Sequence, residues 1–168
     1  MAPLLSTIDT SSIGVIIAFS LYFTYGLFRI KGSSANRGIL KKGKTLQKLK
    51  KLTWEEFEIL CVEVFRAQGW KATGNSIKGS DGGIDIRIKK RSIKGFVQCK
   101  RYKDARVGVK VLREMYGLLS EHGDNKRDYV YIVTSNVFTR ECYKYINKKN
   151  IVLINGEELV DLVRKLLK

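Results

Sequence analysis

The feature that most constrains this chain is an uncharged run of 19 residues from Thr10 to Phe28. A helix needs about 20 mostly apolar residues to cross the hydrocarbon core of a membrane. No proline interrupts the run, and tyrosines near its end are typical of the membrane interface. Residues 1–8 carry no lysine or arginine, which a secretory signal peptide would have. We therefore expect residues 1–30 to form an N-terminal transmembrane anchor, with residues 10–28 in the membrane.

A basic segment follows directly. Residues 29–51, here called the basic collar, hold nine lysines and arginines and no acidic residue. By the positive-inside rule the collar stays in the cytoplasm, which predicts a single-pass membrane protein with a cytoplasmic C-terminal domain. The stretch KGSSANRG is typical of a flexible linker, so we assign residues 31–51 as a basic linker. The collar could bind anionic lipid or the phosphates of a nucleic acid, and the sequence leaves both open.

The remaining domain, residues 52–168, is also basic, with about +8 of the total net charge of +16. Such an excess favours a polyanionic partner, although a solvated basic surface would have the same composition. The chain has three widely spaced cysteines and one histidine, which is too few ligands for a zinc site. The cysteines are best interpreted as small apolar residues in a reducing compartment.

Helix and strand patterns alternate through this domain. Thr53 and Glu56 form a capping-box pattern that begins a helix, and Gly69 ends it. Two alternating strands, GGIDIRIKK and GFVQCKR, follow and are joined by a turn near residues 92–95. A helix over residues 108–123, the apolar strand YVYIVT, and a helix, a short strand and a closing helix complete the chain. This order predicts an α/β fold in which helices flank a central mixed β-sheet.

The first helix presents an unexplained carboxylate. On a helical projection, Phe57, Cys61 and Phe65 lie on the apolar face, and Glu58 borders that face. Burying an unpaired charge costs several kcal/mol, so Glu58 needs a partner. A carboxylate that reaches solvent or pairs with a nearby lysine is an equally good interpretation.

The two strands bring further polar groups together. Asp85 lies at the start of the first strand, and a hairpin would place it roughly 5–8 Å from Gln98 and Lys100. Carboxylate and carbonyl oxygens suit Mg²⁺, and a nearby lysine can orient water or offset phosphate charge. An exposed cross-strand pair of Asp85 with Lys100 would explain the same spacing. Asp81, with Gly82 and Gly83, is expected to shape the preceding loop.

In sequence order, FEILCVEVFRAQGW, GSDGGIDI, VQCKRYK, VYIVTSNVFT and INGEELVDLV resemble the Mrr-like restriction endonucleases, in the PD-(D/E)xK nuclease superfamily. The resemblance covers about residues 52–168. It implies a restriction-endonuclease-like fold and metal-dependent hydrolysis of DNA phosphodiester bonds, with Mg²⁺ or, as a substitute, Mn²⁺.

The resemblance also implies roles for individual residues. Asp85, Gln98 and the backbone carbonyl of Cys99 correspond to metal-binding positions, Lys100 to the catalytic lysine, and Glu58 to the glutamate that completes the site. Gln98 stands where the wider superfamily usually has an acidic residue, which should weaken metal affinity. DNA contacts are expected from the residues that follow the second strand: Arg101, Tyr102 and Lys103. Thr134 and Ser135 either turn the chain or contact phosphate.

The predicted function is therefore that of a membrane-anchored DNA endonuclease acting on foreign or modified DNA. Mrr proteins usually carry a separate DNA-recognition domain, and here the anchor and collar stand in its place, so DNA specificity stays open. A homodimer would let two sites act on two strands. The alternatives are a non-catalytic, membrane-attached DNA-binding module and a lipid-surface scaffold.

Overall fold

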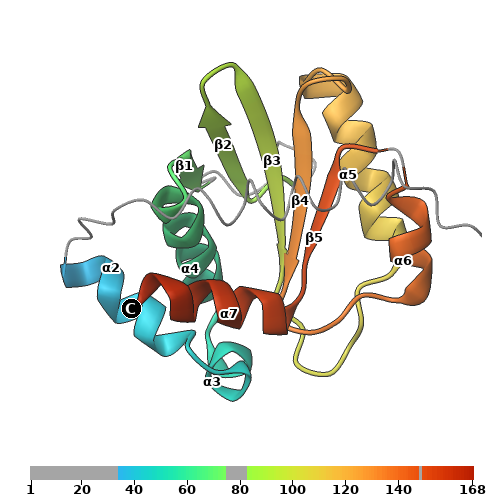
Figure 1. The fold of residues 1–168 in the computed structure, drawn as a ribbon. Coiled ribbons are helices and arrows are strands. Elements are labelled where there is room, and N and C mark those ends of the chain that lie inside the picture. The colour runs from blue at the N-terminus through green and yellow to red at the C-terminus, as the bar shows by residue number, and fades with distance from the viewer. Residues whose placement is uncertain (1–33, 75–82, 148) are drawn as a thin grey trace, which may run out of the picture.

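A five-stranded mixed sheet forms the centre of the molecule (Figure 1). The computed structural model describes residues 34–74, 83–147 and 149–168. The strands are β1 (Lys71–Gly74), β2 (Ile86–Lys90), β3 (Ile93–Lys100), β4 (Tyr129–Thr134) and β5 (Ile151–Ile154), in the spatial order β1-β2-β3-β4-β5. Strands β1, β2 and β3 pair antiparallel, and β3, β4 and β5 pair parallel. The predicted mixed sheet is confirmed.

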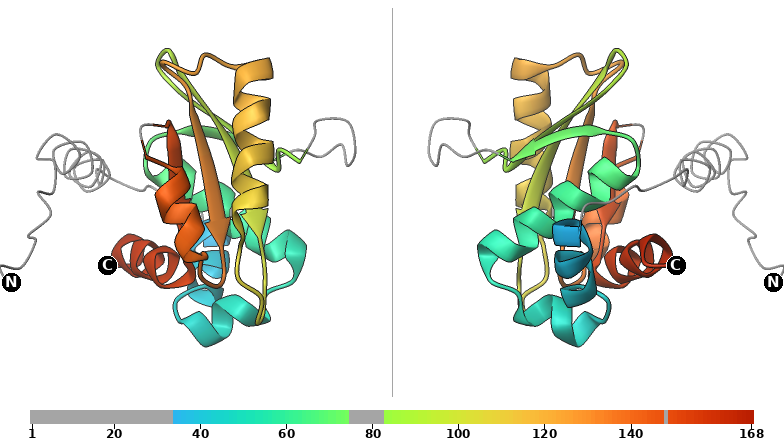
Figure 2. Two further views of the ribbon diagram at one scale, coloured as in Figure 1. Left: turned by 90° about the vertical axis from the view of Figure 1, so that its right-hand side faces the viewer. Right: turned by 90° about the vertical axis from the view of Figure 1, so that its left-hand side faces the viewer.

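Helices cover both faces of the sheet (Figure 2). On one face, α4 (Trp54–Ala67) and α7 (Gly156–Leu166) pack with α2 (Ser34–Lys42) and α3 (Leu46–Lys51). On the other face lie α5 (Val109–His122) and α6 (Arg140–Tyr145). The two faces are filled by alternate residues of the same strands: Val97 and Cys99 pack under α4, whereas Phe96 packs under α5.

The capping box predicted for the first helix is present. The Thr53 hydroxyl accepts a hydrogen bond from the Glu56 N–H, and the Glu56 carboxylate accepts one from the Thr53 N–H at 2.9 Å. The helix ends before Gly69, whose φ of 81° suits glycine. Strand β1 was not predicted, because its four residues carry no repeated alternation.

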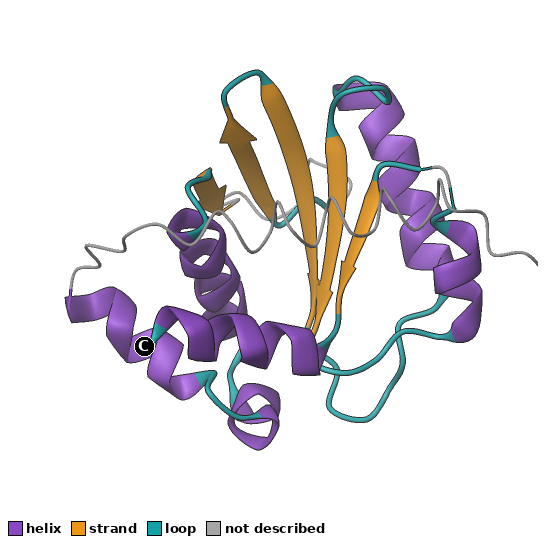
Figure 3. Ribbon diagram, viewed as in Figure 1, coloured by secondary structure: helices purple, strands orange, loops and turns teal. Residues whose placement is uncertain are grey.

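The structure differs from the expected linker over residues 31–51. From Ser34 onward the chain forms two helices, α2 and α3 (Figure 3). Leu40, Leu49 and Leu52 are buried in the same core as α4 and α7. The sequence analysis missed these helices because residues 31–51 contain eight basic residues and only three leucines.

The predicted anchor at residues 10–28 lies outside the described residues and stays a prediction. Among the helices that the structure does describe, none is long and apolar enough to span a bilayer.

Candidate active site

The carboxylate of Asp85 lies where β2 and β3 begin to separate. The Asp85 N–H donates to the carbonyl of Val97 at 2.9 Å, so its backbone still belongs to the hairpin. Its Oδ2 accepts hydrogen bonds from the Cys99 N–H at 2.6 Å and from the Gln98 side-chain amide. Where the backbone pairing of β2 with β3 ends, the side chain of Asp85 therefore accepts the hydrogen bond of a β3 N–H group.

The backbone changes direction at this residue. Ile86 and Ile88 pack on the α4 face of the sheet, as alternation predicts, but Ile84 packs in the opposite cluster under α5. A regular strand would place Ile84, Ile86 and Ile88 on one face, and Ile84 departs from this pattern. Alternation breaks by one residue as it does at a β-bulge, a feature that re-aims a side chain at a strand end. Asp85 precedes β2 and is not part of the regular strand.

Gln98 acts on Asp85 as a hydrogen-bond donor. Its side chain is 7% exposed and its Nε2 donates to Asp85 Oδ2. Its Oε1 lies 2.8 Å from the position that a Cβ on Gly83 would take, and Gly83 has a φ of 105°. A side chain at Gly83 would thus meet both backbone strain and Gln98, so this loop position favours glycine. Asp81 and Gly82 lie outside the described residues.

Cys99 connects the hairpin to the first helix. Its buried thiol has a raised pKa, mainly because it hydrogen-bonds to Cys61 and is desolvated. The negative charges of Asp85 and Glu58 raise this pKa further, which shows that both carboxylates lie near Cys99. Glu58 is half-buried, as the helical projection predicts. The structure therefore brings Glu58 and Asp85 near the same residue, Cys99, toward the end of β3.

Burial raises the pKa of Asp85 above its ordinary value of 3.8. Hydrogen bonds from Cys99 and Gln98 lower it in part, and so does the positive charge of Lys100. Lys100 is therefore close enough to interact with Asp85 electrostatically, as the hairpin argument predicts. The net effect is a carboxylate whose charge is incompletely compensated by the chain itself.

The oxygen atoms at this end of β3 suit a hard cation in part. The N–H and C=O of one residue in a strand face the same neighbour, so the Cys99 carbonyl is directed to the Asp85 side. With the carboxylates of Asp85 and Glu58, it makes a donor set of the kind that Mg²⁺ prefers. Gln98 presents its nitrogen to Asp85 and would need to rotate its amide to act as a ligand. No cluster of three His, Cys, Asp or Glu side chains that could hold a metal occurs within residues 34–74, 83–147 and 149–168.

Three residues at and after the end of β4 fix the loop that follows β3. The Thr134 hydroxyl donates to the Lys100 carbonyl at 2.8 Å, and the Ser135 hydroxyl donates to the Tyr102 carbonyl at 2.8 Å. The Asn136 amide donates to the Lys103 carbonyl at 3.0 Å. Thr134 and Ser135 are fully buried, so they position the chain, and phosphate contact is not their role here. The sequence analysis did not identify Asn136 as a residue that holds this loop. Its position directly after Thr134 and Ser135, at the end of an apolar strand, could have indicated that role.

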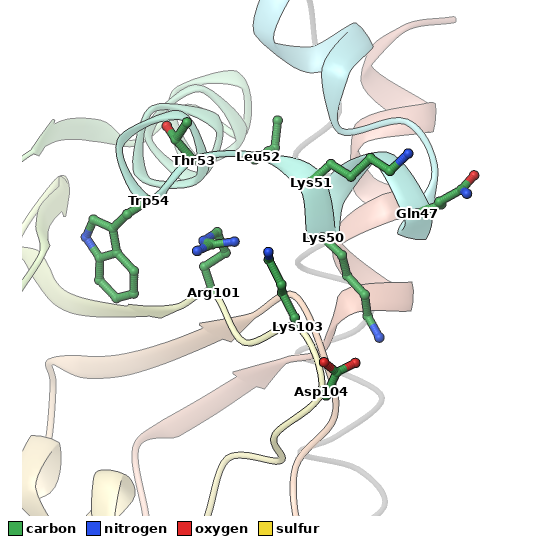
Figure 4. A pocket seen from close by; sticks show the side chains of 9 residues that line it. All are labelled: Gln47, Lys50, Lys51, Leu52, Thr53, Trp54, Arg101, Lys103 and Asp104. Carbon is green, nitrogen blue, oxygen red and sulfur yellow. The ribbon is translucent and has the colours of Figure 1, made fainter.

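The three residues expected to contact DNA do not point the same way. Arg101 and Lys103 line a cleft beside the N-terminus of α4 (Figure 4). Tyr102 packs partly buried against the cluster under α5.

Comparison with known proteins identifies the family of this chain. Residues 49–163, more than half of the chain, match the restriction endonuclease family Mrr_cat. No curated protein matches the chain in a sequence comparison. Among solved structures, the DNA modification-dependent restriction endonuclease AspBHI is 16% identical with a TM-score of 0.53, over 98% of this chain and 40% of that one.

Two further solved structures resemble the chain. Protein VC1899 from Vibrio cholerae is 17% identical with a TM-score of 0.54, over 68% of this chain and 33% of that one. Can2 from Sulfobacillus thermosulfidooxidans, in complex with cyclic tetra-adenylate, is 11% identical with a TM-score of 0.53, over 95% and 54%. The chain thus spans between a third and just over half of these three proteins, and the likeness concerns the fold. On the family match, this chain belongs to the Mrr_cat restriction endonucleases.

Proposed function

We propose that the chain is a divalent-metal-dependent DNA endonuclease that hydrolyses phosphodiester bonds. The observation that carries the proposal is the convergence of Asp85, Cys99 and Glu58 at the end of β3, next to Lys100, in a chain of the restriction endonuclease family. AspBHI is a DNA modification-dependent restriction endonuclease, and we extend to this chain a role in the restriction of foreign or modified DNA.

Each residue of the site has a separate role in this proposal. Asp85, the Cys99 carbonyl and Glu58 would hold Mg²⁺ or Mn²⁺, and Gln98 orients the Asp85 carboxylate. A bound ion would stabilise charge on the phosphate and favour deprotonation of water. Lys100 supplies a fixed positive charge beside Asp85, from which it can orient a water and offset charge on the scissile phosphate.

The site of action follows from the sequence. We propose that residues 10–28 anchor the protein in a membrane and that the nuclease domain faces the cytoplasm, supported by the uncharged run and the basic collar. Fusion of a reporter enzyme to the C-terminus tests this orientation. We also propose a homodimer, which would let two sites act on the two strands of DNA.

Cleavage of DNA by the purified full-length chain tests the activity. The wild type should cut with Mg²⁺ and be inactive with EDTA, and Asp85→Ala or Lys100→Ala should abolish cutting. Lys126→Ala, an exposed lysine at the far end of β4, is the matched control and should cut at the wild-type rate. If the Asp85 and Lys100 variants cut like the wild type, the assignment of the site is wrong. Salt-sensitive binding without cleavage would identify a non-catalytic DNA-binding module instead.

A further inference from the structure

A cationic cleft adjoins the candidate active site (Figure 4). It lies between the α3–α4 junction and the loop after β3, and its volume is about 640 Å³. Four cationic side chains line it, together with one tryptophan and one carboxylate: Lys50, Lys51, Arg101, Lys103, Trp54 and Asp104. Residues on both sides of the cleft are next to candidate site residues. Arg101 directly follows Lys100, and Trp54 lies one helical turn before Glu58.

The two lysines of the cleft come from the basic collar but are held by the nuclease domain. They occupy the last turn of α3, in which Leu49 is fully buried. Leu46 also fixes this helix, because its Cδ1 lies 2.7 Å from the position that a Cβ on Gly156 would take. Lys50 and Lys51 are therefore presented from a packed helix, which distinguishes them from charges on a flexible linker.

The opposite wall contains a donor without an acceptor. The Arg101 Nε is buried and makes no hydrogen bond with the described part of the chain. A buried donor left unpaired is unfavourable, and rotation of the half-exposed guanidinium toward an anion in the cleft would relieve that cost. The loop cannot easily turn Arg101 away, because Thr134 and Ser135 bind the carbonyls on either side of it. The backbone at Arg101 is thus fixed before a ligand arrives.

Trp54 gives the cleft a flat apolar surface. It is the first residue of α4, fixed there by the capping box of Thr53 and Glu56, and its indole lies at the edge of the cleft (Figure 4). Cations that track a phosphate backbone, combined with an aromatic ring on which a base can stack, are the features by which proteins bind single-stranded nucleic acid. A lipid headgroup would use the cations but not the ring.

We infer that this cleft binds a short single-stranded segment of DNA, with its phosphates on Lys50, Lys51 and Arg101 and a base on Trp54. The cleft volume of about 640 Å³ lies in the range of small-ligand sites, about 300–1,000 Å³. A DNA duplex is too wide for a site of this size, since its major groove alone is about 12 Å across. The inference rests on the proposed function and adds to it a substrate class: DNA with an unpaired stretch beside the bond to be cut.

Binding without metal tests the inference separately from cleavage. The full-length chain in EDTA is titrated with a blunt duplex and with the same duplex carrying a single-stranded tail. The tailed duplex should bind about tenfold more tightly, the size expected for one base–aromatic stack. Trp54→Ala should remove this gain and leave blunt-duplex binding within about twofold. Trp54→Phe, which retains an aromatic ring, should keep most of it.

Two further measurements address the stack and the phosphates. In a Trp70→Phe background Trp54 is the sole tryptophan, and its fluorescence should be quenched by the tail. The double variant Lys50→Ala/Lys51→Ala should lower the slope of log K against log salt by about 0.7 for each phosphate that these lysines neutralise. The control is Lys126→Ala/Lys144→Ala, which removes two exposed lysines from elsewhere on the domain and should keep the tail preference.

Several results would overturn the inference. These are equal binding of blunt and tailed DNA, an equal loss of both in Trp54→Ala, and Trp54 fluorescence unchanged by the tail. Displacement of the tail by inorganic phosphate or by a soluble short-chain anionic lipid at the DNA concentration would also overturn it, since the occupant would then be a phosphate group alone. If the chain keeps its preference for tailed DNA but does not cut DNA with metal, the proposed nuclease activity is wrong and this binding site still stands.

Discussion

Two aspartates contact β3, one near each end, and they behave in opposite ways. Asp128, which is 0% exposed, accepts hydrogen bonds from the N–H groups of Lys94 and Asp124 and from the Arg127 guanidinium. Burial would raise the pKa of Asp128, but these donors more than offset it, and the pKa lies below its ordinary value. Burial also raises the pKa of the half-buried Asp85, and there the donors do not offset it.

The contrast separates a structural carboxylate from a candidate catalytic one. Asp128 has donors on both of its oxygens, so the fold satisfies its charge. The two side-chain hydrogen bonds described for Asp85 both end on Oδ2, and its ionised form gains from any further cation. Carboxylates with a perturbed pKa that the fold leaves incompletely compensated are typical of functional sites.

The largest expected effect comes from Asp85→Asn. This change removes the negative charge and keeps an oxygen for the Cys99 N–H. Cleavage should fall at least about 100-fold, the size associated with loss of one electrostatic group at a reacting centre. The free energy of unfolding in EDTA at neutral pH should stay equal or rise, because the poorly compensated charge is gone. Initial cleavage rates and urea unfolding measure the two quantities, and a variant that loses both activity and stability would break the contrast.

Asp128→Ala should show the reverse pattern. The N–H groups of Lys94 and Asp124 lose their fully buried acceptor, and this loss should lower the free energy of unfolding by about 1–3 kcal/mol. Cleavage per folded molecule should not change at temperatures where the variant is folded. The control is Asp161→Ala, which removes an exposed carboxylate 3.7 Å from Arg164 and should shift stability by less than about 0.5 kcal/mol.

Gln98→Glu sharpens the contrast at Asp85 itself. The new carboxylate would lie against Asp85, where Gln98 now donates a hydrogen bond. Without metal, repulsion should lower stability. With metal, the added charge should tighten Mg²⁺ binding by about tenfold, since charge count tunes such sites. Isothermal titration with Mg²⁺ measures the change, and unchanged affinity would show that this position does not contact the ion.

The sequence predicts the regular parts of this molecule and the residue types of the site. The capping box at Thr53, the helix over residues 109–122 and the apolar strand β4 follow from local patterns that burial reinforces. Spacing also predicts that Asp85, Gln98 and Lys100 meet. It does not predict which atoms they use, because the bulge-like break at Asp85 depends on pairing with Val97, 12 residues further along the chain.

Two other features could not be predicted, for related reasons. Helices α2 and α3 are held by leucines that contact α7, more than 100 residues later in the chain, so local charge was the stronger signal. The hydrogen bonds from Thr134, Ser135 and Asn136 to the loop after β3 join residues that are 33 or 34 positions apart in the chain. Local propensity carries no information about such contacts.

The smallest effect lies in how stability depends on pH. For Asp128 the folded pKa is below the ordinary 3.8, so its stabilisation is complete above pH 3.8 and is lost as pH falls through the lower folded pKa. For Asp85 the folded pKa is above 3.8, so folding favours the protonated form, and this contribution is lost as pH rises from 3.8 through the folded pKa. The contribution of Asp128 to stability thus changes below pH 3.8 and that of Asp85 above it. Folding favours the charged form of Asp128 and the protonated form of Asp85.

Urea unfolding of the wild type, Asp85→Asn and Asp128→Asn between pH 3 and 6 in EDTA resolves the two windows. The stability of Asp85→Asn relative to the wild type should increase as pH rises above 3.8 and then level off. The deficit of Asp128→Asn should stay constant above pH 3.8 and shrink below it. Adding Mg²⁺ should reduce the first difference and not the second, because a cation compensates only the carboxylate that the fold leaves short of partners. Parallel curves for the two variants would mean that the two ends of β3 do not differ in this way.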